Sequence, residues 1–349
     1  MLVVALAVLV GLANVMPAAA VSSASSASLS IAPKKNYVVE PGKSVDDKLV
    51  IRNLDTSAPL ELSLRVVDFT FTDEGGTPKL FLAEDAPQTT WSLKPFLTIP
   101  KNVTVEPGAS KSLDMSVAIP ENQGAGSFYS AIVYSSGAPD GGNVGLSASG
   151  VTLVFTSIPG DVNEDLDLEK LGPYRRTAGD TAAGYLPFIT QQEPLMIAYT
   201  LKNNGNVTES PVGSITLTDL FGNERVINDV NPAGSLALIG QTRTFTSCIK
   251  LNADNVEFNG SESEARTCAE PGLWPGFYSI SLNLFYGQNG NRTQEVVGSG
   301  SFLYLPLWFI IVLLIVLAIA AYYIRKVVLK IRGFKQRGYR SRKMNFRKK

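Results

Sequence analysis

"GFYSISLNLFY", residues 276–286, decides the fold class of this chain. Every second residue is large and apolar, in the order Tyr278, Ile280, Leu282, Leu284 and Tyr286. A period of two places alternate side chains on opposite faces of a β-strand, whereas an amphipathic helix has a period of 3.6. The stretch therefore predicts a strand with one face in a hydrophobic core.

The same alternation recurs toward the N-terminus, in residues 60–69, 112–119, 150–158, 194–206 and 213–224. "SFYSAIVY" (127–134) is apolar on both faces, as expected for a central strand. The turns "EPGKS" (40–44) and "EPGAS" (106–110) each introduce a strand, because proline fixes φ and glycine accepts a positive φ. Short strands at this spacing predict an all-β fold of immunoglobulin-like sandwiches.

The pattern restarts after "IPGDVNEDLDLEKL" (158–171), which predicts two domains. We place one immunoglobulin-like β-sandwich at residues 31–158 and a second at residues 159–302. A linker of small residues (21–30) precedes the first sandwich.

An apolar segment, "LYLPLWFIIVLLIVLAIAAYYI" (303–324), follows the second sandwich and carries no charge. A helix of this length crosses the ~30 Å hydrocarbon layer of a bilayer. Trp308 lies near one end, and Tyr322 and Tyr323 lie at the other, where amphipathic rings prefer the headgroup level. The segment predicts a single transmembrane helix; a buried core helix is the alternative.

The charge is strongly divided although the chain has 31 Lys+Arg and 31 Asp+Glu in total. Twelve of the 25 residues of the tail (325–349) are basic and none is acidic, beginning with Arg325 and Lys326 directly after the apolar segment. Basic residues beside a span mark its cytoplasmic side. We therefore expect a cytoplasmic tail attracted to anionic inner-leaflet lipid and sandwiches outside the cell membrane. The tail shows no nucleic-acid-binding motif, so no nucleic-acid partner is expected.

The N-terminus predicts a signal peptide over residues 1–20, with an apolar stretch at 2–13 and small residues Ala18, Ala19 and Ala20 at the cleavage site. No Lys or Arg precedes the apolar stretch. A truncated start and an uncleaved anchor are therefore open alternatives.

Cys248 and Cys268 are the two cysteines of the chain, and both fall in the exported part. Outside the cytoplasm such a pair favours a disulfide over two free thiols. The stretch 248–275 around them is the least regular and is expected to form an exposed loop closed by the bridge.

The chain contains no histidine, which excludes Ser-His-Asp, Cys-His and His-based zinc sites. Ser247 and Lys250 have S-x-x-K spacing, but they lie in a strand-like run where catalysis would need a helix. We expect no enzymatic activity and no cofactor.

Residues 161–167 alternate oxygen ligands as a calcium loop does, at Asp161, Asn163, Asp165 and Asp167. Leu166 replaces the glycine of the sharp turn, and glycine rather than glutamate occupies the twelfth position. The residues favour an acidic strand between the domains, and no metal site is predicted.

"WSLKPFLTIPKNVTVEPGASKSLDMSVAIPENQGAGSFYSAIVY" (91–134) combines strands, a Pro-Gly turn, an "IP" pair and an aromatic strand. It resembles the first domain of the bacterial WxL-interacting surface proteins and the PapD-like branch of immunoglobulin folds. The likeness in residues covers mainly 31–158, and the order of segments is similar over nearly the whole chain. The second domain resembles CARDB-like sandwiches. The resemblance implies binding to peptidoglycan or to partner surface proteins.

Together these features predict a prokaryotic, single-pass surface protein whose ectodomain docks a partner surface protein or a cell-wall polymer. An exposed sheet edge would accept a partner strand, and the loops 135–145 and 252–275 would supply contacts. The alternative is a membrane-tethered, chaperone-like factor for assembly of envelope or surface structures.

Overall fold

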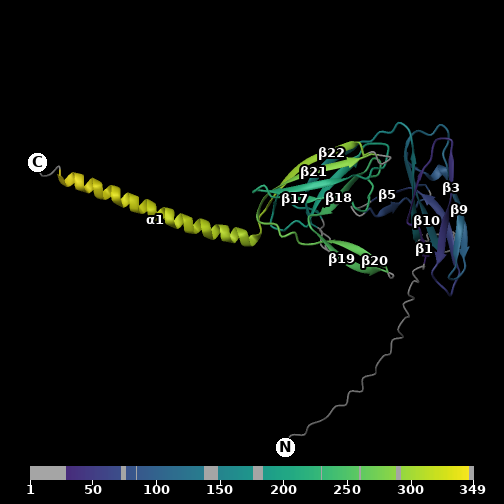
Figure 1. Cartoon of the computed structure of the whole chain (residues 1–349), viewed down its shortest axis with the longest axis horizontal. Coiled ribbons are helices and arrows are strands. Elements are labelled where there is room, and N and C mark those ends of the chain that lie inside the picture. Colours follow the sequence, from purple (N-terminus) through teal and green to yellow (C-terminus); the bar gives the residue numbers. More distant parts are fainter. Residues whose placement is uncertain are drawn as a thin grey trace, which may run out of the picture.

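The computed structural model describes residues 29–71, 76–83, 85–136, 148–175, 184–228, 230–258, 261–287 and 292–345. It contains two immunoglobulin-like β-sandwiches followed by one apolar helix (Figure 1), so the predicted fold class is confirmed. The predicted signal peptide (1–20), most of the linker (21–30) and most of the loop 135–145 lie outside the described residues.

The first sandwich packs a four-stranded sheet against a five-stranded sheet. The four-stranded sheet has the order β1-β3-β9-β7, and its strands are Leu29–Ile31, Ser44–Asn53, Ser110–Ala118 and Leu97–Thr98. The five-stranded sheet has the order β2-β11-β10-β4-β8, and its strands are Lys34–Val38, Ala148–Ile158, Gly126–Ser136, Leu60–Val67 and Asn102–Val105. The predicted Pro-Gly turns are present: Gly42 and Gly108, with φ of 75° and 67°, lie just before β3 and β9.

The second sandwich repeats this arrangement. One sheet has the order β13-β12-β15-β18, and its strands are Gly184–Tyr185, Leu166–Arg175, Met196–Asn203 and Thr242–Cys248. The other has the order β14-β22-β21-β16-β17, and its strands are Ile189–Thr190, Gln294–Tyr304, Gly276–Tyr286, Val212–Asp219 and Glu224–Ile227. In each sandwich, a short strand (β2 or β14) runs parallel to the last strand of the domain (β11 or β22).

Each sandwich has its own inner core, built from the alternating residues that the sequence pattern indicates. In the second sandwich Tyr278, Ile280, Leu282, Leu284 and Tyr286 of β21 are all buried in that core. The inner core of the first sandwich includes Leu49, Ile51, Met115, Val117 and Ile132. Removal of these side chains from water is the main source of stability of each domain.

The helix α1 (Leu307–Asn345) begins four residues later than the sequence predicts. Leu303 and Tyr304 belong to β22, where they pair with Phe277 and Gly276 of β21. Because these residues are in a strand, the helix starts after them. Pro306 separates the strand from the helix. The helix then continues through the predicted end of the span and into the basic tail.

Two hairpins lie outside the sandwich sheets. β5 (Phe69–Phe71) pairs with β6 (Pro78–Leu80), and a short 3₁₀ helix, η1 (Lys94–Phe96), follows later in the same connection. β19 (Leu251–Phe258) pairs with β20 (Ser261–Cys268) along its whole length. The prediction of an irregular loop over 248–275 is therefore wrong for this part. Most of these positions are polar, so the strand pairing comes without the apolar alternation that marks a half-buried strand.

Candidate functional site

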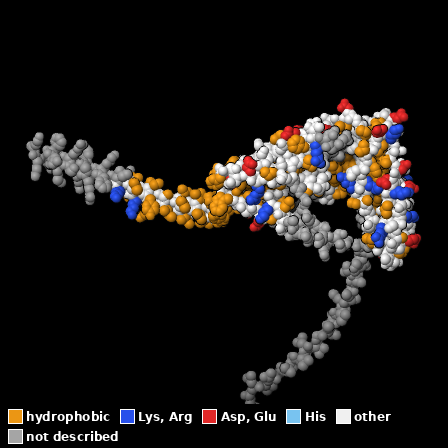
Figure 2. All heavy atoms as spheres, viewed as in Figure 1, with side chains coloured by type: hydrophobic (Ala, Val, Ile, Leu, Met, Phe, Trp, Pro, Cys, Tyr) orange, Lys and Arg blue, Asp and Glu red, His pale blue; other side chains and the backbone are white. Residues whose placement is uncertain are grey.

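The apolar helix has the length, composition and exposure of a membrane span. Within residues 307–330, the most apolar window of 18 residues has a mean hydropathy of 2.8, and none of that window is buried by the rest of the chain (Figure 2). A core helix of a soluble protein would be covered by its own domain. The predicted interface residues Trp308, Tyr322, Tyr323, Arg325 and Lys326 all lie on α1 and are exposed.

The two sandwiches are joined by a third hydrophobic cluster, which we call the interdomain core. Its buried members are Val67, Phe69, Tyr129, Ala131, Val133 and Phe155 from the first sandwich and Leu238 from the second. The ring of Tyr129 lies 5.3 Å from that of Phe69 and 5.7 Å from that of Phe155, between centroids. An apolar contact of this kind opposes the relative motion that is usual between domains.

Hydrogen bonds surround the interdomain core. The Ser127 amide donates to the Asn206 carbonyl oxygen at 3.0 Å, and the Thr208 amide donates to Ser127 Oγ at 3.0 Å. The Arg243 guanidinium of the second sandwich lies 4.9 Å from the centroid of the Phe71 ring of the first. These contacts fix the orientation of one sandwich on the other.

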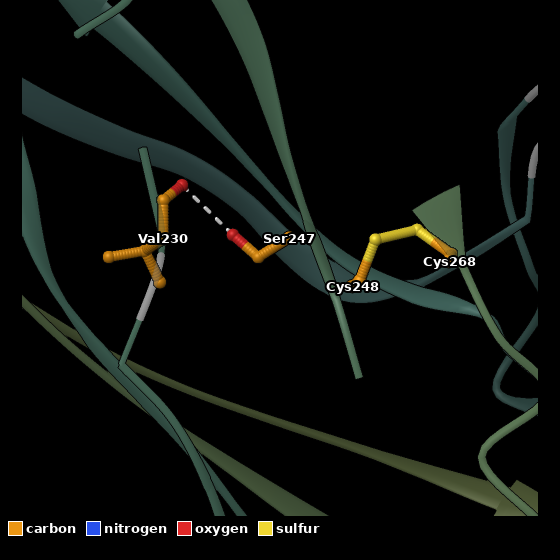
Figure 3. The surroundings of a disulfide bond; sticks show 4 residues. All are labelled: Val230, Ser247, Cys248 and Cys268. Carbon is orange, nitrogen blue, oxygen red and sulfur yellow. Dashed lines mark hydrogen bonds between the residues drawn. A yellow bond between two sulfur atoms is a disulfide. The ribbon is translucent and has the colours of Figure 1, made fainter. Parts of the chain in front are cut away.

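The predicted disulfide is present: Cys248 and Cys268 are bonded, with their Cα atoms 5.2 Å apart (Figure 3). The bridge joins the end of the edge strand β18 to the end of β20, so it closes the base of the β19–β20 hairpin. The strand beside it is held in the sandwich, because the buried Ser247 hydroxyl donates to the Val230 carbonyl oxygen at 2.9 Å. Ser247 thus lies on a strand, as predicted.

Within the described residues, β19 and β20 pair only with each other, so both outer edges of the hairpin lack a neighbouring strand. The hairpin extends away from the second sandwich in Figure 1. Its sequence (251–268) contains Asp254, Glu257, Glu262 and Glu264 against a single basic residue, Arg266. The disulfide therefore closes a two-stranded ribbon that is acidic in sequence and whose edges pair with no further strand in the described structure.

A pocket of about 150 Å³ lies on the first sandwich, and Arg65, Asp68 and Lys94 are among its lining residues. Among the described residues of that lining, Asp68 is the only acidic one. Its carboxylate accepts hydrogen bonds from Ser92 Oγ at 2.6 Å, Ser130 Oγ at 3.0 Å and the Thr89 amide at 3.0 Å. These hydrogen bonds hold the connection before η1 against β10.

The acidic stretch at 161–167 joins the two sandwiches: residues 161–165 lie between β11 and β12 outside any strand, so the predicted acidic strand begins only at Leu166, where β12 starts. The Asn163 and Asp165 carbonyl oxygens accept hydrogen bonds from the Asn206 and Asn204 amides, at 3.0 and 2.9 Å. In the described part of the chain, no group of three or more His, Cys, Asp or Glu side chains is arranged to hold a metal ion. The hydrogen bonds to Asn163 and Asp165 attach the connection to residues 204–206 of the second sandwich.

The sequence carried one signal for the interdomain core, the apolar residues on both faces of 127–134. They fall on β10, whose outer face packs against the segment Leu236–Ile239 of the second sandwich. That segment has no strand periodicity, so its role as a cover was not predicted. The polar sequence of the β19–β20 hairpin likewise gives no indication of a strand pair with unpaired outer edges.

No protein-family model matches this chain, and no curated protein matches it. Among solved structures, the class 5 fimbrial chaperone CfaA aligns over 80% of this chain and 100% of its own, at 13% identity and a TM-score of 0.34. The Escherichia coli chaperone DraB covers 80% of this chain and 96% of its own, at 12% identity and a TM-score of 0.30. The Pseudomonas aeruginosa chaperone CupB2 covers 75% and 96%, at 9% identity and a TM-score of 0.28. Values this low assign neither a family nor a function.

Proposed function

We propose that this chain is a membrane-anchored docking protein that holds a partner surface protein outside the cell through its β19–β20 hairpin. The observation that carries the proposal is the hairpin itself: a disulfide-closed ribbon whose two edges have no neighbouring strand in the described structure. An extended segment of a partner would add to such an edge through backbone hydrogen bonds. The four carboxylates of the hairpin against one arginine favour a partner segment with net positive charge.

The rest of the chain supports this role mechanically. The interdomain core makes the two sandwiches one body, and α1 would anchor that body in the membrane with the basic tail on the cytoplasmic side. A docking element on a rigid, tethered body loses less conformational freedom on binding than one on a mobile arm. The proposal is similar to the role that resemblance to WxL-interacting proteins implies.

The test is a pull-down with the full-length protein, immobilised in nanodiscs, as the bait. Isolated cell wall and total surface protein are offered to it as separate samples. We expect one defined protein to bind, and we expect binding to weaken as salt rises because charges contribute to recognition. The matched variant replaces residues 253–266 with a short Gly-Ser linker and keeps both cysteines; it should lose the partner while unfolding at the wild-type temperature.

Three other outcomes would overturn the proposal. Retention on protease-treated wall would make the ectodomain a binder of a cell-wall polymer. Transient binding of many unfolded subunits would support the chaperone-like alternative. Equal capture by the wild type and the hairpin variant would place the docking surface elsewhere.

A further inference from the structure

The second sandwich is fixed directly to the start of α1. β22 ends at Tyr304, and two residues, Leu305 and Pro306, separate it from the helix. The Leu305 amide donates to the Thr190 carbonyl oxygen at 2.8 Å, and the Phe309 amide donates to that of Pro306 at 2.9 Å. The apolar part of the helix begins at Leu307, so a membrane crossed by α1 meets the end of the sandwich at its surface.

Large apolar side chains gather at this end of the sandwich. They come from three separate segments and have exposed fractions from 38% to 79%; they are Phe188, Ile189, Leu220, Phe221, Trp274 and Phe277. We call these six residues the membrane-proximal collar. In Figure 2, hydrophobic side chains continue from the helix onto the adjoining end of the second sandwich.

The strand register places all three segments at the same end. The Leu303 amide donates to the Phe188 carbonyl oxygen at 2.7 Å, and Phe277 pairs with Leu303. Asp219, at the end of β16, pairs with Tyr278, so the turn that follows it carries Leu220 and Phe221 past the same edge.

Exposed aromatic residues are rare elsewhere on the described ectodomain. Among the ectodomain residues whose side chains the structure describes, Phe285 is the one strongly exposed Phe or Trp outside the collar, and the first sandwich exposes only Val38, Val50 and Leu54 among its large apolar side chains. Contiguous exposed apolar surface marks an interaction site, and aromatic rings prefer the bilayer interface.

We propose that the collar lies in the interfacial layer of the bilayer, so that the second sandwich rests on the lipid surface. The ring centroids of Trp274 in the collar and Trp308 on the helix are 6.4 Å apart, which joins the collar to the helix's own interface anchor. Contact of several collar residues with the lipid fixes the tilt of the ectodomain. It therefore also fixes the distance between the hairpin and the bilayer surface. This inference rests on the membrane anchorage in the proposed function.

The first test uses tryptophan fluorescence of the full-length protein in vesicles containing lipids brominated near the headgroup. Trp308→Phe leaves Trp274 as the reporter of the collar, and Trp274→Phe leaves Trp308 as the reporter of the helix. The double variant leaves Trp91, which lies against the interdomain core and serves as the unquenched background. We expect bromolipid to quench both Trp274 and Trp308.

The outcomes separate the two proposals. Quenching of Trp308 without quenching of Trp274 would overturn the collar and leave the anchor in place. Absence of quenching at Trp308 would overturn the anchor, and the collar with it.

The second test places a spin label at Phe221→Cys and, as its matched control, at Val297→Cys. Val297 is also exposed, but it lies on β22 about 24 Å from Tyr304 at the ~3.4 Å rise of a strand. In vesicles, we expect the ratio of oxygen to water-soluble nickel accessibility to be several-fold higher at position 221. Equal, water-like ratios at both positions would contradict the proposal.

Discussion

β10 of the first sandwich and β21 of the second occupy the same position, at the centre of the sheets β2-β11-β10-β4-β8 and β14-β22-β21-β16-β17. Along β21, buried and more exposed residues alternate, as in a sheet with one face in water. Along β10, buried residues occur on both faces, because the outer face is covered by the interdomain core. Strands with the same position in one topology therefore differ because of what packs on their outer face.

The connections differ as well. Between β9 and β10 the first sandwich has only residues 119–125, whereas the corresponding connection of the second sandwich, from β18 to β21, contains the disulfide and the β19–β20 hairpin. The first sandwich carries its insertion between β4 and β8, where β5 and β6 pack beside the interdomain core. The second sandwich thus holds both the candidate docking element and the membrane-proximal collar.

The outer faces of β10 and β21 give the largest expected difference. Tyr129→Ala removes a fully buried ring from the interdomain core and should lower the free energy of unfolding by about 3–5 kcal/mol. Phe285→Ala, on the exposed face of β21, should cost less than about 1 kcal/mol. Urea unfolding of both variants checks this. Equal losses would mean that the interdomain core does not exist in solution.

The disulfide should matter only for the second sandwich. Cys248→Ser with Cys268→Ser should destabilise the hairpin region by about 3 kcal/mol, since the bridge closes a 20-residue separation. Hydrogen exchange should show faster exchange in β19 and β20 and unchanged exchange in β3 and β9. Faster exchange throughout the chain would show that the bridge supports the whole ectodomain.

A buried asparagine at the end of β3 and its counterpart at the end of β15 should give equal effects. Nδ2 of Asn53 donates to two backbone carbonyl oxygens, at 2.8 and 3.2 Å, and Nδ2 of Asn203 does the same at 2.7 and 2.9 Å. Replacing either residue with alanine removes both hydrogen bonds at a buried site, which should cost about 2–3 kcal/mol in each case. Thermal unfolding of the two variants compares them directly. Clearly unequal losses of stability would show that the two positions are not equivalent.

The stability of the two sandwiches should respond to pH in opposite directions. Burial, together with the nearby Glu164, raises the pKa of Glu209 in the second sandwich to about 7. Hydrogen bonds from Lys35 and Tyr37 lower the pKa of Asp47 in the first sandwich to about 2. Glu209 therefore loses its contribution to stability as pH rises from about 4.5 to 7, whereas Asp47 loses its contribution as pH falls from about 4 to 2.

Glu209→Gln should match the wild type at pH 5 and be more stable by about 2 kcal/mol at pH 8, because the neutral amide avoids burying a charge. Asp47→Asn, at a half-exposed site, should change stability by about 0.5 kcal/mol at either pH. Unfolding curves at the two pH values measure both. A Glu209→Gln variant with no pH-dependent gain would show that water reaches this carboxylate.

The strands of both cores could be predicted because alternation records a buried face, as Tyr278 to Tyr286 show. The apolar helix could be predicted from its length and lack of charge, but its start was misplaced because Leu303 fits both a strand and a helix. The β19–β20 hairpin could not be predicted, because its polar sequence contains no apolar alternation. The packing of Leu236–Ile239 on the outer face of β10 could not be predicted either. An irregular segment has no periodicity that would indicate which domain it packs against.

The most direct measurement is site-specific photo-crosslinking in intact cells, with a photoreactive residue at position 257 in the hairpin. The same residue at position 50, exposed on the first sandwich, is the control. We expect one defined crosslinked partner from position 257 and none from position 50. Crosslinks to that partner from position 50 alone, or no crosslink from the hairpin, would contradict a docking role for the β19–β20 hairpin.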